Sequence, residues 1–88
     1  MPVISQFYGI LIYMYREIGG HHNEPHIHIK YNEFEMSITI NGKVLNGKMP
    51  KKQKKLVDAW LELHKEELNA AWYALNNDGE IIKIKGLE

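Results

Sequence analysis

The chain of 88 residues contains no cysteine. This absence excludes disulfide bonds, cysteine-ligated zinc, iron–sulfur clusters and thiol catalysis. The chain also lacks a charge imbalance, because 11 basic and 11 acidic side chains give a formal net charge of zero. No whole-protein field therefore attracts nucleic acid, and any binding of RNA or DNA needs a local patch.

Long hydrophobic runs are missing as well. The longest apolar runs fall far short of the roughly 20 residues that a helix needs to cross a bilayer. Residues 1–6 lack the basic start and the apolar stretch that are typical of a signal peptide. We therefore expect a cytoplasmic protein with no membrane partner.

The composition that remains is typical of a globular protein, with 44% hydrophobic and 25% charged residues. The length fits one α+β domain over residues 1–88. We predict strands over about 3–45, helices over about 50–77 and a short C-terminal strand over about 80–85. The strands are expected to form an antiparallel meander of three to four strands, and the helical region to form two helices or one bent helix.

The first half of the chain has the pattern of strands. Residues 3–15 are rich in β-branched and aromatic side chains and are interrupted by Gly9, which indicates two strands or one bent strand. Residues 26–31 and 34–40 alternate between apolar and polar side chains, as half-buried strands do. A tight turn at residues 32–33 is expected to join them.

Signals for a further turn and for the helices follow. Asn41-Gly42 is a strong hairpin signal, after which residues 43–45 are expected to pair back. Pro50 suits the first turn of a helix. A single helix over residues 50–77 would overhang so small a domain, so we predict a break near His64 to Glu66.

Histidines are concentrated in one stretch, at His21, His22, His26 and His28. Residues two apart on a strand share a face, so His26, His28 and Lys30 are expected to point together toward a cleft or solvent. The residues expected to pack inward are Ile27, Ile29 and Tyr31.

One hypothesis for this stretch is a site for a divalent metal such as zinc. An H-x-H pair with a third histidine or a carboxylate is a workable first shell. The candidate ligands are His22, His26, His28 and Glu24.

A second hypothesis is acid–base chemistry on RNA, which would require no cofactor. Histidines exchange protons near neutral pH, and a metal-independent ribonuclease needs such groups together with cations for the phosphate. The candidate catalytic residues are His26, His28 and His22, and the candidate substrate or phosphate-binding residues are Lys30, Arg16, Tyr31, Lys51 and Lys52. The plainer alternative is a set of polar residues on the wet face of a strand.

Lysines 48, 51, 52, 54 and 55 surround the start of the predicted helix. Cations there oppose the helix dipole, so helix stability does not explain them. A role in contacting phosphate or an acidic partner is one interpretation, and a solvated face of the helix is the plainer alternative. Trp60, Trp72 and His64 follow the helical period and are more typical of core positions than of a site.

Several of these residues together resemble a small bacterial family catalogued as domain of unknown function 4160. The resemblance covers nearly the whole chain. It rests on Pro2, Ile4, Phe7, Gly9, Ile10, Ile12, Met14 and Tyr15, then His22, Pro25, His26, His28 and Tyr31, then Val44, Leu45, Gly47, Met49 and Pro50, and finally Leu56, Val57, Trp60, His64, Glu67, Leu68 and Trp72.

The resemblance implies membership of a two-gene cassette of toxin–antitoxin type. It also implies a small cognate protein partner, with RNA and a second copy of the chain open as further partners. Three functions follow as hypotheses. They are a cassette component acting on RNA or a protein through the histidine-rich strand, a non-enzymatic metal-binding module, and a pure protein-interaction domain.

Overall fold

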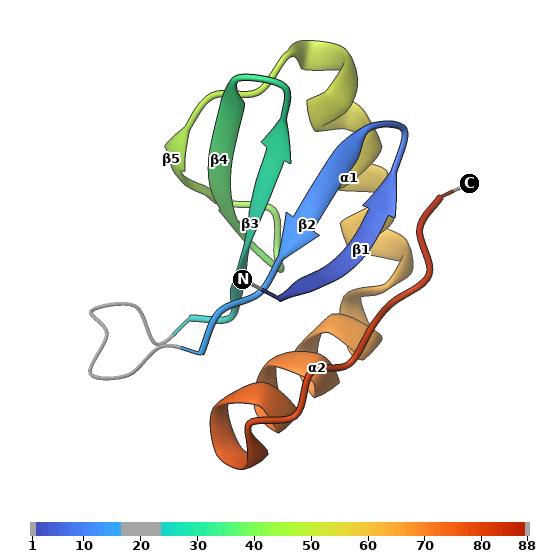
Figure 1. The fold of residues 1–88 in the computed structure, drawn as a ribbon. Coiled ribbons are helices and arrows are strands. Elements are labelled where there is room, and N and C mark those ends of the chain that lie inside the picture. Colours follow the sequence, from blue (N-terminus) through green and yellow to red (C-terminus); the bar gives the residue numbers. More distant parts are fainter. Residues whose placement is uncertain (1, 17–23, 88) are drawn as a thin grey trace.

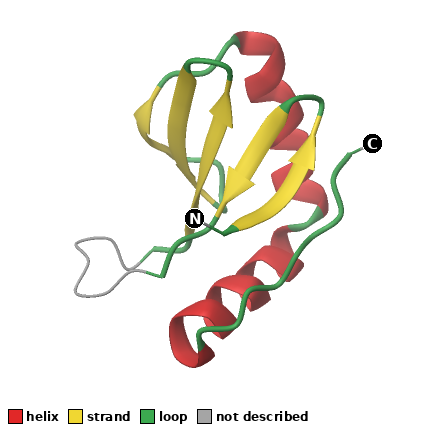
Figure 2. Ribbon diagram, in the orientation of Figure 1, coloured by secondary structure: helices red, strands yellow, loops and turns green. Residues whose placement is uncertain are grey.

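The computed structural model describes residues 2–16 and 24–87, and it is α+β as the sequence predicts. A five-stranded antiparallel sheet in the order β1-β2-β3-β4-β5 precedes two helices that cover one of its faces (Figures 1 and 2). The elements are β1 (Val3–Phe7), β2 (Ile10–Tyr13), β3 (His26–Tyr31), β4 (Phe34–Thr39), β5 (Val44–Gly47), α1 (Lys51–Leu63) and α2 (Lys65–Asp78).

The sheet has five strands, where the sequence predicts three to four. Gly9 belongs to a tight turn between β1 and β2 and has a φ of +77°, so the region before residue 15 is two strands rather than one bent strand. The turn at Asn32 joins β3 to β4, with a φ of +52°. Residues after Asn41-Gly42 pair back on β4 as predicted. They form β5, the fifth strand of the sheet.

The helical region is two helices, with the break at His64 as predicted. His64 has a φ of −116° and a ψ of 20°, which ends α1 and begins α2 without Gly or Pro. Its Nδ1 lies 2.7 Å from Oε1 of Glu67, and its ring centroid lies 5.6 Å from that of Trp60. His64 is therefore a helix-junction residue. Neither helix has the length or the apolar run that crossing a bilayer requires.

The core lies between the sheet and the helices. The inward positions of the strands supply mostly isoleucine, and α1 supplies Trp60, which is fully buried and packs on Phe7 with ring centroids 5.4 Å apart. Ile27 and Ile29 point into this core as predicted, and Tyr31 packs at its margin. The period-two pattern of β3 thus decides which of its residues face away from the helices.

The predicted strand over residues 80–85 is wrong. This C-terminal segment lies along the outer edge of β1 (Figure 1), but it makes one backbone hydrogen bond there, from Ile84 N–H to the Ile4 carbonyl at 2.8 Å. The carbonyl of Lys85 accepts a hydrogen bond from Nε1 of Trp60 at 2.9 Å. One backbone hydrogen bond to β1 does not make a ladder, so the segment runs beside the sheet without joining it.

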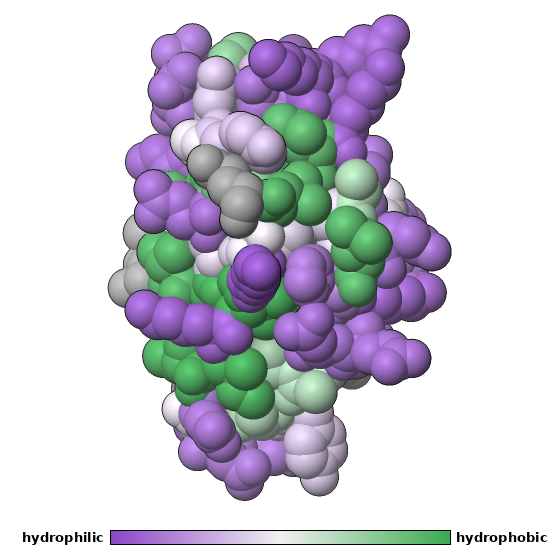
Figure 3. Space-filling view, turned by 90° about the vertical axis from the view of Figure 1, so that its right-hand side faces the viewer, coloured by the Kyte–Doolittle hydropathy of each residue, from purple (hydrophilic) through white to green (hydrophobic). Residues whose placement is uncertain are grey.

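The two edges of the sheet consequently differ. The C-terminal segment covers the edge of β1, where Ile84 is 5% exposed. In the part of the chain that the structure describes, β5 pairs with β4 alone, so its outer edge is open. Seen from the side of β1, hydrophobic side chains form separate groups between hydrophilic ones (Figure 3).

Candidate functional site on the outer face of the sheet

The face of the sheet turned away from the helices, here called the outer face, carries a row of polar side chains. Tyr13 of β2 is paired with His28 of β3, His28 with Ser37 of β4, and Ser37 with Asn46 of β5. We call these four residues the polar row. The antiparallel register aligns them across four strands, although they are far apart in the sequence.

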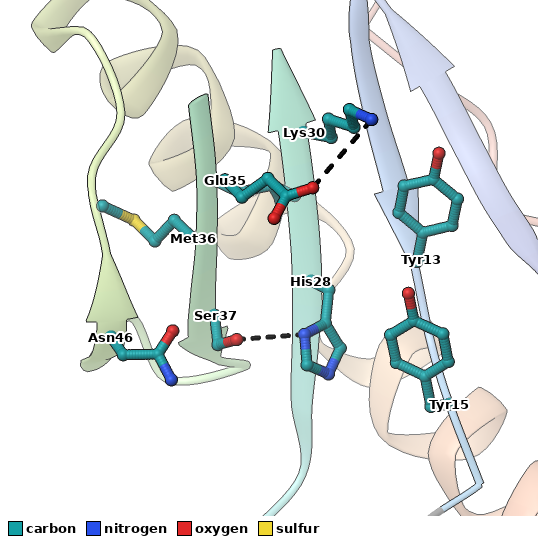
Figure 4. A pocket seen from close by; sticks show the side chains of 9 residues that line it. Tyr13, Tyr15, His28, Lys30, Glu35, Met36, Ser37 and Asn46 are labelled. Atoms are coloured by element: carbon teal, nitrogen blue, oxygen red, sulfur yellow. Dashed lines mark hydrogen bonds and ion pairs between the residues drawn. The ribbon is translucent and has the colours of Figure 1, made fainter. Parts of the chain in front are cut away.

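A shallow pocket of about 130 Å³ lies over the polar row (Figure 4). This volume is below the roughly 300–1,000 Å³ of typical small-molecule sites, so the pocket suits contact with a larger partner better than capture of a small ligand. The residues that line it are Tyr13, Tyr15, His28, Ile29, Lys30, Glu35, Met36, Ser37 and Asn46.

His28 is held at the centre of the polar row. Its Nδ1 is hydrogen-bonded to the Ser37 hydroxyl at 3.0 Å (Figure 4), and its ring meets that of Tyr15 edge-on with centroids 4.4 Å apart. Its Nε2 is buried. With one nitrogen bonded inside the protein and the other buried, His28 is placed to shape the pocket rather than to exchange protons with a bound molecule.

The alternation of β3 predicts that His26 faces a cleft or solvent. This prediction is wrong. His26 is 3% exposed, and its ring lies 5.1 Å from that of Trp72 and 5.3 Å from that of His28. Helix α2 reaches past the end of the sheet (Figure 1), and its Trp72 packs against His26, the first residue of β3. The Nδ1 of His26 donates to the Glu24 carbonyl at 2.9 Å, which places the proton of a neutral ring on Nδ1.

Tyr13 and Tyr15 form an aromatic surface beside the pocket. Their rings are parallel within 5° with centroids 6.3 Å apart, and their faces are turned outward (Figure 4). Burial raises the pKa of the Tyr15 phenol above its ordinary 10.0, and the nearby Tyr13 and Glu35 raise it further. Tyr15 therefore remains a neutral hydrogen-bonding group at physiological pH.

Charge on the outer face is balanced. Lys30 Nζ lies 3.9 Å from Oε1 of Glu35 on the neighbouring strand, and both side chains are largely exposed. An ion pair so exposed contributes little to stability, so either group can exchange its partner for a ligand. Lys30 thus places a cation at the pocket of the outer face, and its phosphate-binding role stays a prediction.

The other predicted phosphate-binding residues lie elsewhere. The guanidinium of Arg16 is beside Gly79, where α2 ends. A cation at the C-terminus of a helix interacts favourably with the helix dipole. Lys52 lines a different pocket, together with Tyr31 at the far end of β3. Tyr31 is five positions after His26 on β3, which is roughly 16 Å along the strand. Tyr31 and Lys52 therefore do not share a site with His26. Lys51 precedes Lys52 in the first turn of α1.

The metal hypothesis involves one residue that falls outside the described part of the chain, His22. Within residues 2–16 and 24–87, no three histidine or carboxylate side chains come together as a metal site. The exposed Glu24 contacts His26 through its backbone carbonyl. A histidine whose Nδ1 donates to a carbonyl is nevertheless oriented as many metal ligands are, with Nε2 as the coordinating atom.

The family model described as "Domain of unknown function (DUF4160)" matches residues 9–73. The chain belongs to this family. The match includes the polar row, both histidines of β3 and all of α1. No curated protein and no solved structure matches the chain.

Sequence reasoning missed five residues of the outer face as site residues. They are Tyr13, Tyr15, Glu35, Ser37 and Asn46. The alternation of β4 already places Glu35 and Ser37 on the face away from its apolar side chains. The alternation of residues 10–15 does the same for Tyr13 and Tyr15. The missing information was the register, which decides that residues from four strands meet.

Proposed function

We propose that this chain is the component of a two-gene cassette of toxin–antitoxin type, working in the cytoplasm, and that it binds single-stranded RNA through the outer face of its sheet. The observation that supports this most directly is the polar row with the adjoining Tyr13 and Tyr15 rings. Sheet faces that bind single-stranded RNA combine aromatic rings, on which bases stack, with polar groups that reach the base edges.

Binding fits the geometry better than cleavage does. A general base must reach the proton that it removes, and the hydrogen-bonded Nδ1 and buried Nε2 of His28 do not offer this. In contrast, Asn46 is exposed at one end of the polar row and Lys30 is exposed beside it, where they can contact a base edge and a phosphate.

The direct test is fluorescence anisotropy with a labelled single-stranded RNA and a duplex of the same sequence. We expect the single strand to bind more tightly. Replacing Tyr13 and Tyr15 by alanine should weaken binding by about tenfold or more for each base that loses its stacking partner. The matched control is Tyr73→Ala, since Tyr73 is 67% exposed on α2, away from the outer face.

Equal RNA affinity in the Tyr13→Ala/Tyr15→Ala double variant would contradict the outer-face assignment. The cassette role has its own test, which is induced expression in growing cells. Growth arrest that is relieved by the double variant, but not by Tyr73→Ala, supports a toxin acting through this face. Normal growth with abundant protein counts against the toxin side of the cassette.

A metal-binding module is a second candidate, and the hydrogen bond from His26 Nδ1 to the Glu24 carbonyl favours it. The ligands under this proposal are His22, His26 and His28, with Glu24 as a fourth. Elemental analysis of protein purified without a histidine tag tests it. Less than about a tenth of a metal ion per chain rejects a tight site.

A protein partner is the third candidate, and the open edge of β5 favours it. Lys43 and Lys48 flank this strand and are both exposed, which would suit a partner strand with acidic ends. Pull-down from the native cell under gentle salt separates the candidates. A small protein retained by the alanine variants of His22, His26 and His28, with no RNA, would favour a pure interaction domain.

A further inference from the structure

A second pocket lies at the opposite end of the sheet from His26. Its volume is about 390 Å³, which is within the roughly 300–1,000 Å³ of small-molecule sites. The β1–β2 turn, the end of β3 and the first turns of α1 meet there (Figure 1). The residues that line it are Tyr8, Tyr31, Lys52, Gln53 and Leu56.

Gln53 is the residue that points to a ligand. It is only 9% exposed, yet its side-chain amide has no hydrogen-bond partner among the described residues. The amide nitrogen and oxygen are reached by solvent from the pocket, so a ligand could replace the water bound to them. Because Gln53 lines the pocket, a ligand with a donor and an acceptor side by side would satisfy the amide.

The charged residue that lines the pocket is Lys52, in the first turn of α1. The first turn of α1 contains Lys51 and Lys52 and no acidic residue, and Pro50 provides no side-chain cap. Within the described residues, no carboxylate lies within ion-pair distance of Lys52. This end of the pocket therefore favours an anion. The unpaired N–H groups at the start of α1 also attract negative charge.

Two aromatic rings complete the pocket. Tyr8 is 53% exposed in the β1–β2 turn, and Tyr31 lies against Gly9 of the same turn. A Cβ at Gly9 would lie 3.4 Å from Cε1 of Tyr31, an ordinary contact, so this ring packs directly on the turn. Aromatic faces are suited to stacking on a flat heterocycle.

We propose that this pocket binds a nucleoside monophosphate. The base stacks on the tyrosine rings and pairs its edge with the Gln53 amide, while Lys52 contacts the phosphate. An apolar side chain of a protein partner would fill the same space but leave the Gln53 amide unsatisfied. This site is separate from the outer face, and it does not depend on RNA binding there.

The experiment is an NMR titration of the full chain with adenosine 5′-monophosphate, observing backbone amide shifts. We expect shifts at Tyr8, Tyr31 and Gln53. Adenosine, which lacks the phosphate, and ribose 5-phosphate, which lacks the base, should each bind about tenfold more weakly or worse. Inorganic phosphate should bind no more tightly than ribose 5-phosphate.

Two variants distinguish the contacts. Gln53→Leu should weaken adenosine 5′-monophosphate and adenosine by about fivefold each. Lys52→Ala, at an exposed position where folding is not at risk, should weaken the nucleotide and leave adenosine unchanged. The matched control is Lys65→Ala, an exposed lysine at the start of α2.

Several results would overturn the proposal. Inorganic phosphate binding as tightly as the nucleotide would mean an adventitious ion only. The absence of shifts at Tyr31 and Gln53, or shifts confined to Tyr13 and His28, would remove the site. A short polyglutamate peptide that shifts the same amides while the nucleotide does not would assign the pocket to an acidic protein.

Discussion

At the residue scale, the two histidines of β3 have different surroundings in spite of their shared face. His26 is enclosed by Trp72 and donates to a backbone carbonyl, whereas His28 depends on a serine of the neighbouring strand. The Ser37 hydroxyl fixes the ring of His28 beneath the pocket. This cross-strand hydrogen bond, together with the contact between the His28 and Tyr15 rings, helps to shape the outer face.

Two buried serines give a prediction about that bond. Ser37→Ala should lower the free energy of unfolding by about 1–2 kcal/mol, because the hydrogen bond between Ser37 and His28 is lost. Ser5→Ala is the matched control, since Ser5 is 7% exposed and its hydroxyl has no partner in the described residues. The control should be neutral or stabilising by about 1 kcal/mol. Urea unfolding of both variants measures this, and equal destabilisation would contradict it.

The raised pKa of Tyr15 predicts a pH dependence. Unfolded tyrosine has a pKa of 10.0, and burial, Tyr13 and Glu35 raise the folded value above it. Below about pH 10 both states hold the proton, so this group gives no pH dependence; above that, the free energy of unfolding falls as pH rises. Denaturant unfolding across this range should show the decline in the wild type.

The decline should be smaller in Tyr15→Phe and unchanged in Tyr73→Phe, which removes an exposed phenol. Glu35→Gln should lower the pKa of Tyr15, because it removes one of the negative charges that disfavour the phenolate. Ultraviolet titration follows the phenols directly. A wild-type curve without an elevated phenol would contradict the assigned cause.

At the scale of elements, the ends of the strands and helices depend on a few backbone positions. Gly47 ends β5 with a φ of +89°, and Gly79 ends α2 with a φ of +69°. Gly47 also lies so close to β4 that a Cβ would collide with the Glu35 carbonyl and lie 2.7 Å from Cα of Met36. Two constraints, conformation and space, thus require glycine at the end of β5.

Replacing Gly47 by alanine should therefore be more harmful than the same change at Gly42. Gly42 has a φ of +97° but no atom within 4 Å of an added Cβ, so Gly42→Ala carries the conformational cost alone, about 1 kcal/mol. Gly47→Ala should cost about 2–4 kcal/mol, because β4 and β5 must separate. Thermal unfolding compares the pair, and equal losses would mean that β5 moves freely.

At the scale of the whole molecule, the C-terminal segment connects the sheet to the helices. Ile84 is buried beside β1, and the neighbouring Lys85 carbonyl accepts a hydrogen bond from the buried Trp60. Gly86 lies so close to Phe7 that a Cβ there would be 2.9 Å from the Cβ of Phe7. These contacts make the segment part of the core although it has no regular structure.

Two isoleucines in this segment provide a matched test. Ile84→Ala should lower the free energy of unfolding by about 2–4 kcal/mol, because Ile84 is 5% exposed. Ile81→Ala should cost less than about 1 kcal/mol, since Ile81 is 49% exposed. Chemical denaturation measures both. Similar small losses would mean that the segment contributes little to the core.

The features that depend on local sequence were the ones that could be predicted. Alternation in residues 26–31 and 34–40 and the turns at Asn32 and Asn41 are local, and they gave the order of the elements and the inward side of β3. The meeting of Tyr13, His28, Ser37 and Asn46 depends on pairing between distant strands, which local pattern does not contain.

Burial of His26 is likewise a long-range effect. It follows from where α2 lies after the break at His64, and no pattern within β3 indicates Trp72 as its neighbour. The prediction of a C-terminal strand is wrong for a related, long-range reason. Ile81, Ile82 and Ile84 have the residue types of a strand, but the segment makes only the Ile84–Ile4 backbone hydrogen bond to β1, and the Lys85 carbonyl accepts from the Trp60 indole.

The unequal edges of the sheet limit how copies of this molecule can aggregate. A sheet with two open edges can add neighbours without end, as in a cross-β fibre. Here the C-terminal segment blocks the edge of β1, so strand-to-strand contact is restricted to β5. Two molecules joined through β5 would form a closed symmetric pair with no open edge for a third. Within the described residues, a segment without regular structure thus leaves one edge of the sheet, rather than two, for the addition of strands.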